Sequence, residues 1–233
     1  MRYSESGSGV INTLNTLTAT ASTGINLNGN NTVTGLVTLD NTNGTPSGDI
    51  FYTSANSGLT IVTGTNAAAI GPNNTFNVTE TTGDLQVSGI NGIRTTGGAV
   101  NVTVQGAGKS LTLNSGSGID TTFGGATTGA SVTLTADDMA IGAAVNAGSG
   151  ANTVVLKPYA TNRTINITNG GTGQLDLSPT EIQFVSVAGG TLQLGSTGAT
   201  GDINLNATLH SADVNAGTLK LLSGHDVNIT GTK

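Results

Sequence analysis

A short triplet of the form apolar, polar, apolar recurs along the whole chain and constrains its fold more than any other feature. Side chains that alternate with a period of two are typical of a β-strand with one buried and one solvent-facing side. Gly, Asn, Ser or Thr bounds each triplet within a few residues, which indicates short strands and frequent turns. The pattern therefore predicts an all-β fold. The triplets are Ile25-Asn26-Leu27, Phe76-Asn77-Val78, Leu85-Gln86-Val87, Leu111-Thr112-Leu113, Val132-Thr133-Leu134, Ile165-Asn166-Ile167, Leu175-Asp176-Leu177, Leu192-Gln193-Leu194, Ile203-Asn204-Leu205, Leu219-Lys220-Leu221 and Val227-Asn228-Ile229.

Glycine holds a fixed place before many of these strands, two residues ahead of the first inward apolar side chain. At a sharp corner a positive φ costs glycine little, so the repeated glycine predicts a repeated corner. The chain is therefore an imperfect structural repeat. The glycine segments are Gly48-Asp49-Ile50, Gly83-Asp84-Leu85, Gly173-Gln174-Leu175, Gly190-Thr191-Leu192, Gly201-Asp202-Ile203 and Gly217-Thr218-Leu219.

Two architectures fit short strands with frequent turns: a two-sheet sandwich with hairpins, and a parallel solenoid of stacked coils. Asn-Gly pairs such as Asn28-Gly29 and Asn91-Gly92 are typical of hairpin turns, so the sandwich remains an alternative. The abundance of Asn, Thr and Ser favours the solenoid, in which like residues stack into hydrogen-bonded ladders. At roughly 20 to 27 residues per coil and about 4.8 Å per rung, we expect about nine to eleven coils and a rod of roughly 45 to 55 Å.

The 233 residues are expected to form one continuous body. Residues 1–24 are rich in Thr and Ser and are interpreted as an N-terminal cap, an arm or a frayed first coil, and residues 25–233 as a single β-solenoid domain. The sequence Ser178-Pro179-Thr180-Glu181 has the residues of a helix capping box, but the apolar run after it favours a tight corner between two strands. We expect no signal peptide and no membrane span.

Composition excludes several classes of function. Only seven Lys and Arg residues accompany 13 Asp and Glu, for a net charge of −6, so we expect no binding to nucleic acid. With no cysteine, the chain has neither a disulfide framework nor a thiolate metal site.

The two histidines are the first candidates for chemistry. His210 and His225 are followed closely by Asp213 and Asp226, and two imidazoles with two carboxylates would hold a divalent ion if two coils stacked them. Their spacing matches no familiar metal motif, so we favour solvated loop residues.

Two acidic or glycine-rich segments give weaker signals. Asp137-Asp138 suggests a surface cation site, but a turn pair is the preferred interpretation. The run Gly170-Gly171-x-Gly173 begins like a calcium-binding β-roll motif, yet Asp176 comes one residue late and the motif does not repeat, so we favour a glycine corner.

Carbohydrate chemistry would require clustered acids and bases, whereas those of this chain are scattered. Phe51-Tyr52, Phe123 and Tyr159 are the candidates for stacking on a sugar, and each is more simply interpreted as core or loop packing. Thr-x-Thr pairs, as at Thr79-Glu80-Thr81, leave ice binding as a minor alternative. We therefore expect no enzyme, and no catalytic, cofactor-binding or metal-binding residue.

Residues 130 to 229 also resemble a known protein family, while residues 25–129 resemble it only in their general residue pattern. Its residues are Ala136-Asp137-Asp138-Met139-Ala140-Ile141, Val145-Asn146-Ala147-Gly148, Val154-Val155-Leu156-Lys157-Pro158, Arg163-Thr164-Ile165-Asn166-Ile167, Leu175-Asp176-Leu177-Ser178-Pro179-Thr180-Glu181-Ile182 and Gly190-Thr191-Leu192-Gln193-Leu194-Gly195. They resemble the repeat region of filamentous-haemagglutinin-like surface proteins of bacteria. The resemblance implies a right-handed parallel β-helix from a large secreted adhesin or exoprotein.

These observations predict a non-enzymatic, extracellular structural or adhesive rod, a segment of a larger bacterial surface or secreted adhesin. Its partners would be other copies of itself, or glycans or proteins of a host or cell surface. An alternative is a self-assembling filament subunit joined through terminal strand edges, because an exposed edge templates further pairing. A carbohydrate-active β-helix is the third hypothesis.

Overall fold

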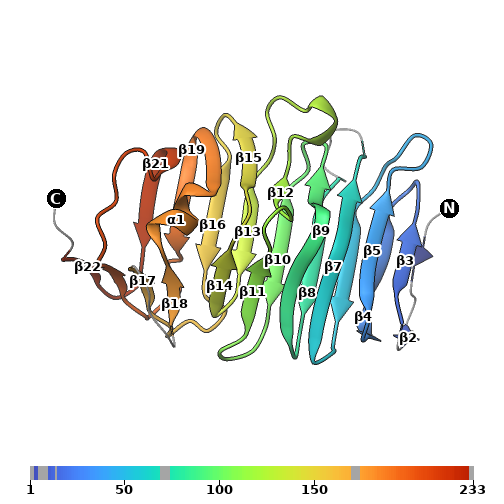
Figure 1. Cartoon of the computed structure of the whole chain (residues 1–233), viewed down its shortest axis with the longest axis horizontal. Helices are drawn as coiled ribbons and strands as arrows, with labels where there is room; N and C mark the ends of the chain where they lie inside the picture. Colours follow the sequence, from blue (N-terminus) through green and yellow to red (C-terminus); the bar gives the residue numbers. More distant parts are fainter. Residues whose placement is uncertain (1–2, 5–9, 14, 69–73, 169–173, 231–233) are drawn as a thin grey trace.

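The structure is a computed structural model that describes residues 3–4, 10–13, 15–68, 74–168 and 174–230. It is almost entirely β and forms a parallel solenoid of about eight turns, so the predicted fold class is confirmed. Figure 1 shows the turns following one another along the long axis, with β3 near one end of the stack and β22 at the other. The longest helix in the described part of the chain has five residues, and none is long and apolar enough to cross a membrane.

Most strands span two to six residues, five span eight to twelve, and the registered strand pairs run parallel, as a solenoid requires. The strands are β1 (Tyr3–Ser4), β2 (Asn12–Thr13), β3 (Leu17–Thr20), β4 (Ile25–Val33), β5 (Leu36–Asn41), β6 (Ile50–Ser54), β7 (Gly58–Asn66), β8 (Phe76–Glu80), β9 (Asp84–Thr95), β10 (Val100–Val104), β11 (Ser110–Leu113), β12 (Ile119–Asp120), β13 (Val132–Thr135), β14 (Asp138–Ile141), β15 (Val145–Ser149), β16 (Thr153–Lys157), β17 (Ile165–Ile167), β18 (Leu175–Leu177), β19 (Val185–Gly195), β20 (Ile203–Leu205), β21 (Asn215–Leu222) and β22 (Val227–Ile229). A single turn of 3-10 helix spans Phe123–Gly125, and α1 spans Pro179–Gln183.

One face of the solenoid shows how the coils stack. Strands β4, β6, β8, β10, β13, β16 and the second halves of β19 and β21 pair in that order, and we call them face A. The first inward residue of each strand lies directly over that of the next. These residues form a continuous apolar row along the axis, and all but the last are fully buried: Ile25, Ile50, Phe76, Val100, Val132, Val154, Leu192 and Leu219.

The number of coils is smaller than the sequence predicts, and the register explains the difference. Most steps along face A cover 22 to 27 residues, as expected, but 32 residues separate Val100 from Val132 and 38 separate Val154 from Leu192. These two long coils reduce the count to about eight turns. At about 4.8 Å per rung the stack is roughly 38 Å long, shorter than predicted.

The longest coil contains a local exchange of strand order. Strands β18, β17, β20 and β22 form a separate four-stranded sheet, which we call the terminal sheet. Although β17 precedes β18 in the sequence, β18 lies beside β14, and β17 pairs with both β18 and β20. The chain therefore places two successive strands on one side of the solenoid before it returns to face A through β19.

Like residues stack into ladders on the outer surface, as predicted. On face A the amide of Asn101 donates to Oδ1 of Asn77 at 2.9 Å. On the terminal sheet the amide of Asn228 donates to Asn204 and that of Asn204 to Asn166, each at 3.0 Å. Each bond joins side chains at the same position of neighbouring coils, so the ladders reinforce the register that the apolar rows establish.

The recurring glycines are needed mainly because neighbouring coils approach closely there. The predicted reason, a positive φ at a sharp corner, is therefore corrected. Gly48 has a positive φ of 82°, as a corner glycine should. The φ of Gly201 is not positive, but a Cβ there would lie 2.2 Å from the carbonyl oxygen of Arg163 on an adjacent coil. At Gly83 the corresponding distance to the backbone carbon of Ser57 is also 2.2 Å. Gly173 lies outside the described residues.

The segment Ser178–Glu181 begins a helix, so the predicted tight corner is wrong at this point. Ser178 is the N-cap of α1, and its side chain accepts a hydrogen bond from the backbone N–H of Glu181. The carboxylate of Glu181 in turn accepts from the backbone N–H of Ser178, which completes the capping box. The same carboxylate accepts from the backbone N–H of Ile141 at 3.1 Å, so the box also attaches the helix to β14.

The described part of residues 1–24 contributes three short strands to the stack. Strands β1 and β2 both pair with β4, and β3 pairs with β5. The backbone N–H of Ile11 donates to Oδ1 of the buried Asn31 at 2.8 Å.

Candidate functional site

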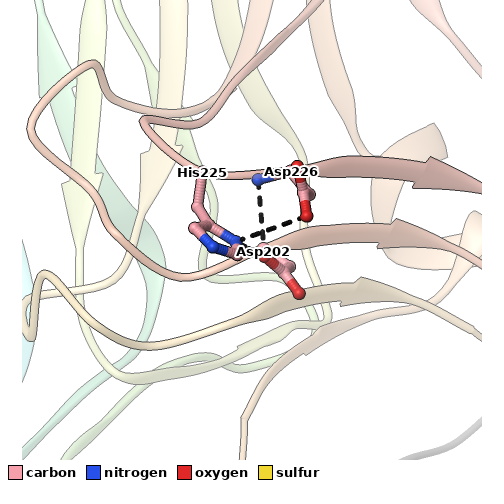
Figure 2. A group of neighbouring side chains, drawn as sticks. All are labelled: Asp202, His225 and Asp226. Atoms are coloured by element: carbon pink, nitrogen blue, oxygen red, sulfur yellow. Dashed lines mark hydrogen bonds and ion pairs between the residues drawn. The ribbon is translucent and has the colours of Figure 1, made fainter.

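The chemistry-bearing side chains gather at one corner of the terminal sheet. Asp202 lies immediately before β20, and His225 with Asp226 lies immediately before β22. Because Ile203 is in register with Val227, the two turns lie on neighbouring coils. Figure 2 shows the three side chains converging from these turns. We call Asp202, His225 and Asp226 the corner cluster.

One imidazole nitrogen contacts both carboxylates of the corner cluster. Nδ1 of His225 lies 2.5 Å from Oδ1 of Asp202 and 3.6 Å from Oδ2 of Asp226. The ligand atoms of the three residues all lie within 4.8 Å of one another. The side chains are 34%, 60% and 68% exposed for Asp202, His225 and Asp226, so the corner is open to solvent.

The charges of the corner cluster shift two pKa values in opposite directions. The hydrogen bond to Asp202 raises the pKa of His225, and the charge of Asp226 adds to this effect. The same hydrogen bond lowers the pKa of Asp202. An imidazolium between two carboxylates offsets the repulsion that stacked like charges would otherwise produce.

The structure assembles only part of the four-residue set considered from the sequence. His225 and Asp226 meet, but Asp202 completes their cluster. His210 pairs instead with Asp213, at 3.3 Å between Nδ1 and Oδ2. The backbone N–H of His210 and the amide of Gln183 also donate to the Asp213 carboxylate, and the backbone bond is the main reason that its pKa is lowered. Asp202 could have been found because it precedes the first inward residue of its triplet, as Asp226 does.

The Asp137-Asp138 pair is not a surface cation site, because its first member is buried. Asp137 accepts from the backbone N–H groups of Gly108 at 2.9 Å and Ala160 at 2.7 Å. Its Oδ2 also lies 3.8 Å from Nη1 of Arg163. Asp138 is exposed, and partial desolvation raises the pKa of its carboxyl. Asp137 is therefore a structural carboxylate that joins separate coils.

The glycines at 170, 171 and 173 of the other suggested cation motif lie outside the described residues. Asp176 is described, and its Oδ1 accepts from the amide of Asn166 at 2.8 Å. This contact makes Asp176 the first member of the ladder that continues to Asn204 and Asn228.

The four aromatic candidates occupy different environments. Tyr52 is buried in the core, and Phe51 and Tyr159 are exposed at separate places. Phe123 lines a pocket with Ile90, Arg94 and Asp120, among other residues, and we call this pocket the Phe123 groove. The Arg94 guanidinium lies 5.4 Å from the centre of the Phe123 ring. Ile90, at 88% exposed, is the most exposed large apolar side chain of the described residues.

One threonine row forms on face A, although the Thr-x-Thr pairs themselves lack a period in the sequence. Thr53, Thr79 and Thr103 lie at equivalent positions of three successive coils. The second outward row of face A lies two residues earlier in each strand and includes Phe51 and Asn101. The outer surface of face A is therefore not covered by threonine alone.

The chain was compared with protein families, with curated proteins and with solved structures. No protein-family model, no curated protein and no solved structure matches the chain. The parallel β-solenoid that the resemblance to filamentous-haemagglutinin-like proteins implies is present, and the more specific family assignment stays a proposal.

Proposed function

We propose that this chain is a non-enzymatic structural and adhesive rod, a segment of a larger extracellular bacterial adhesin of the filamentous-haemagglutinin-like kind. The observation that carries the proposal is the continuous apolar row of face A, which runs through the successive coils without interruption. Each coil contacts the next through backbone hydrogen bonds, side-chain ladders and a shared core, and such a stack is a stiff element.

The pockets support a non-enzymatic role over a carbohydrate-active β-helix. Three pockets contain one carboxylate each, Asp49, Asp120 and Asp84. Glycoside hydrolysis commonly uses two carboxyl groups about 5 to 9.5 Å apart. Asp49 is bound by Thr75, and Asp120 by Thr122 and Asn146, so both carboxylates serve the local structure.

Negative-stain electron microscopy of the purified chain, at rising concentration, tests the rod. Separate short particles of constant length would support a passive segment of a larger adhesin. Unbranched fibres that lengthen with concentration would favour the filament alternative below, and compact globules would contradict the solenoid itself. Labelling of intact source cells with an impermeant amine reagent tests the extracellular assignment, which requires modification of the exposed Lys220 before lysis.

The adhesive part of the proposal assigns a glycan to the Phe123 groove. The groove places the Phe123 ring and the exposed aliphatic side chain of Ile90 beside the guanidinium of Arg94. Sugars are commonly recognised by such a combination of an apolar platform with hydrogen-bonding groups. A glycan array with the wild-type chain and with Ile90→Ser tests it. Loss of a wild-type signal in the variant supports the assignment, and equal signals contradict it.

The alternative, a self-assembling filament subunit, is favoured by the exposed edge of β22. Among the described residues β22 pairs only with β20, and its apolar Val227 and Ile229 are 43% and 61% exposed. The amide ladder of the terminal sheet reaches Asn228 on the same strand. A further strand would cover this edge, and the filament proposal assigns that strand to a second copy of the chain.

Light scattering against concentration tests the filament with a matched pair of variants. The double substitution V227K/I229K places charge on the β22 edge and should abolish concentration-dependent growth. Ile90→Lys places charge on a more exposed apolar residue elsewhere and should leave growth unchanged. Growth that survives V227K/I229K would exclude this edge as the joint.

A further inference from the structure

We propose that the corner cluster of Asp202, His225 and Asp226 binds a divalent transition-metal ion of the Zn²⁺ type. The inference is independent of the rod and filament proposals. It rests on the geometry of three potential ligands that two neighbouring coils bring to one corner.

One of the ligand separations already suits a small tetrahedral ion, and a second reaches the required value after a small movement. At tetrahedral Zn²⁺, with bonds of about 2.1 Å, ligand atoms lie about 3.4 Å apart. Nδ1 of His225 is already 3.6 Å from Oδ2 of Asp226. The contact of 2.5 Å between Nδ1 and Oδ1 of Asp202 must open by roughly 1 Å. Because the Asp202 side chain is one third exposed, rotation of its carboxylate can supply that movement.

Hydrogen bonds fix the two turns relative to each other before any ion arrives. The Ser223 hydroxyl donates to the carbonyl of Gly201 at 2.8 Å and accepts from the backbone N–H of His225 at 2.9 Å. The backbone N–H of Asp226 points to Oδ1 of Asp202 at 3.4 Å. The turns therefore hold the ligands at one corner, so little ordering is required on binding.

The ligand types select the class of ion. Imidazole nitrogen and carboxylate oxygen are both ligand types that Zn²⁺ and its neighbours accept, whereas Ca²⁺ takes six to eight oxygen ligands. Three protein ligands leave a coordination position for water, and the exposed side chains allow water to reach it. A bound ion would join the coil of β20 to that of β22.

The second histidine provides an internal control. His210 has one carboxylate partner, Asp213, which the amide of Gln183 and the backbone N–H of His210 also occupy. It therefore offers a two-ligand arrangement with its carboxylate already engaged. Since the chain has only these two histidines, an untagged protein reports on both sites at once.

The experiment is a titration of the untagged full chain with Zn²⁺. Binding is monitored by calorimetry and by the imidazole proton resonances in NMR spectra. We expect one ion per chain, with the His225 resonance shifting and that of His210 unchanged. His225→Gln should abolish the binding, Asp226→Asn should weaken it at least tenfold, and His210→Gln should leave it unaltered. Co²⁺ should give the visible absorption of a tetrahedral site in the wild type and in His210→Gln only.

Several results would overturn the proposal. These are equal shifts of both histidines, a His225→Gln variant that keeps the wild-type affinity, and the absence of any saturable binding. Circular dichroism of each variant without metal shows whether its fold is intact. If His225→Gln fails to fold, Asp226→Asn alone decides, because its exposed side chain contributes little to packing.

Discussion

Replacement of Asp137 by Asn should destabilise the solenoid strongly, although the sequence presents this residue as one half of an unremarkable acidic turn. The Asp137 carboxylate is buried and accepts two backbone N–H groups, from Gly108 and Ala160. The guanidinium of Arg163 faces it at 3.8 Å, with only 16% of the Arg163 side chain exposed. Gly108 lies just before β11, whereas Ala160 and Arg163 share the turn between β16 and β17, so one carboxylate joins two parts of the stack.

The magnitude follows from what Asn cannot do. Its single carbonyl oxygen can replace only one of the two acceptor oxygens, so one backbone N–H would face the amide group. Arg163 would keep a largely buried charge without its anion. Removing one member of a buried ion pair typically costs about 3 to 5 kcal/mol. For a chain of this size that corresponds to a fall in Tm of roughly 6 to 20 °C.

Thermal unfolding followed by circular dichroism tests the prediction, and Asp138→Asn is the matched control. Asp138 is adjacent and exposed, and its raised pKa shows that its surroundings already disfavour the charged form. The control should therefore change stability by no more than about 0.5 kcal/mol. Equal Tm values for the two variants would refute the assignment of Asp137 as a structural carboxylate.

Three further predictions concern the core, the coil contacts and the corner cluster. Leu192→Asp places a charge in the buried row and should unfold its coil and loosen its neighbours, whereas Gln193→Asp, facing outward, should change the Tm little. Gly201→Ala should cost about 1 to 3 kcal/mol in urea unfolding because its Cβ would meet backbone, while Gly198→Ala, with open space around the added Cβ, should be neutral. In chelator-treated protein, NMR titration should give His225 a pKa above 6.5. Since the folded pKa is the higher one, its stabilising contribution should be complete below pH 6.5 and lost as the pH rises through the folded pKa. A pKa for His225 at or below 6.5 would contradict the hydrogen bond.

Much of the fold could be predicted because the relevant signals are local. Alternation within Leu192-Gln193-Leu194 predicts which side chains point inward, and the structure buries both leucines. The recurrence of asparagine predicts stacked amides, and Asn77 and Asn101 form such a pair. The capping box at Ser178 is also a local signal, and it outweighed the apolar run that follows it.

The candidate site could be predicted only in part. The pairing of His225 with Asp202 spans 23 residues of sequence and depends on the length of the intervening coil. His210 and Asp213, in contrast, are three residues apart and meet within one turn. Sequence proximity therefore indicates the second pair, while only the register of β20 with β22 brings the corner cluster together.

By itself, the sequence determined the strand type and the inward and outward faces, because each depends on neighbouring residues. It favoured parallel stacking over a hairpin sandwich, because residues of the same type recur along the chain. The tertiary structure decided the number of coils, the exchange of β17 and β18, the burial of Asp137 and the composition of the corner cluster. These features depend on how each coil registers with the next. That register is set by the summed packing of whole rows of side chains and by the variable length of the turns, which no single segment of the chain encodes.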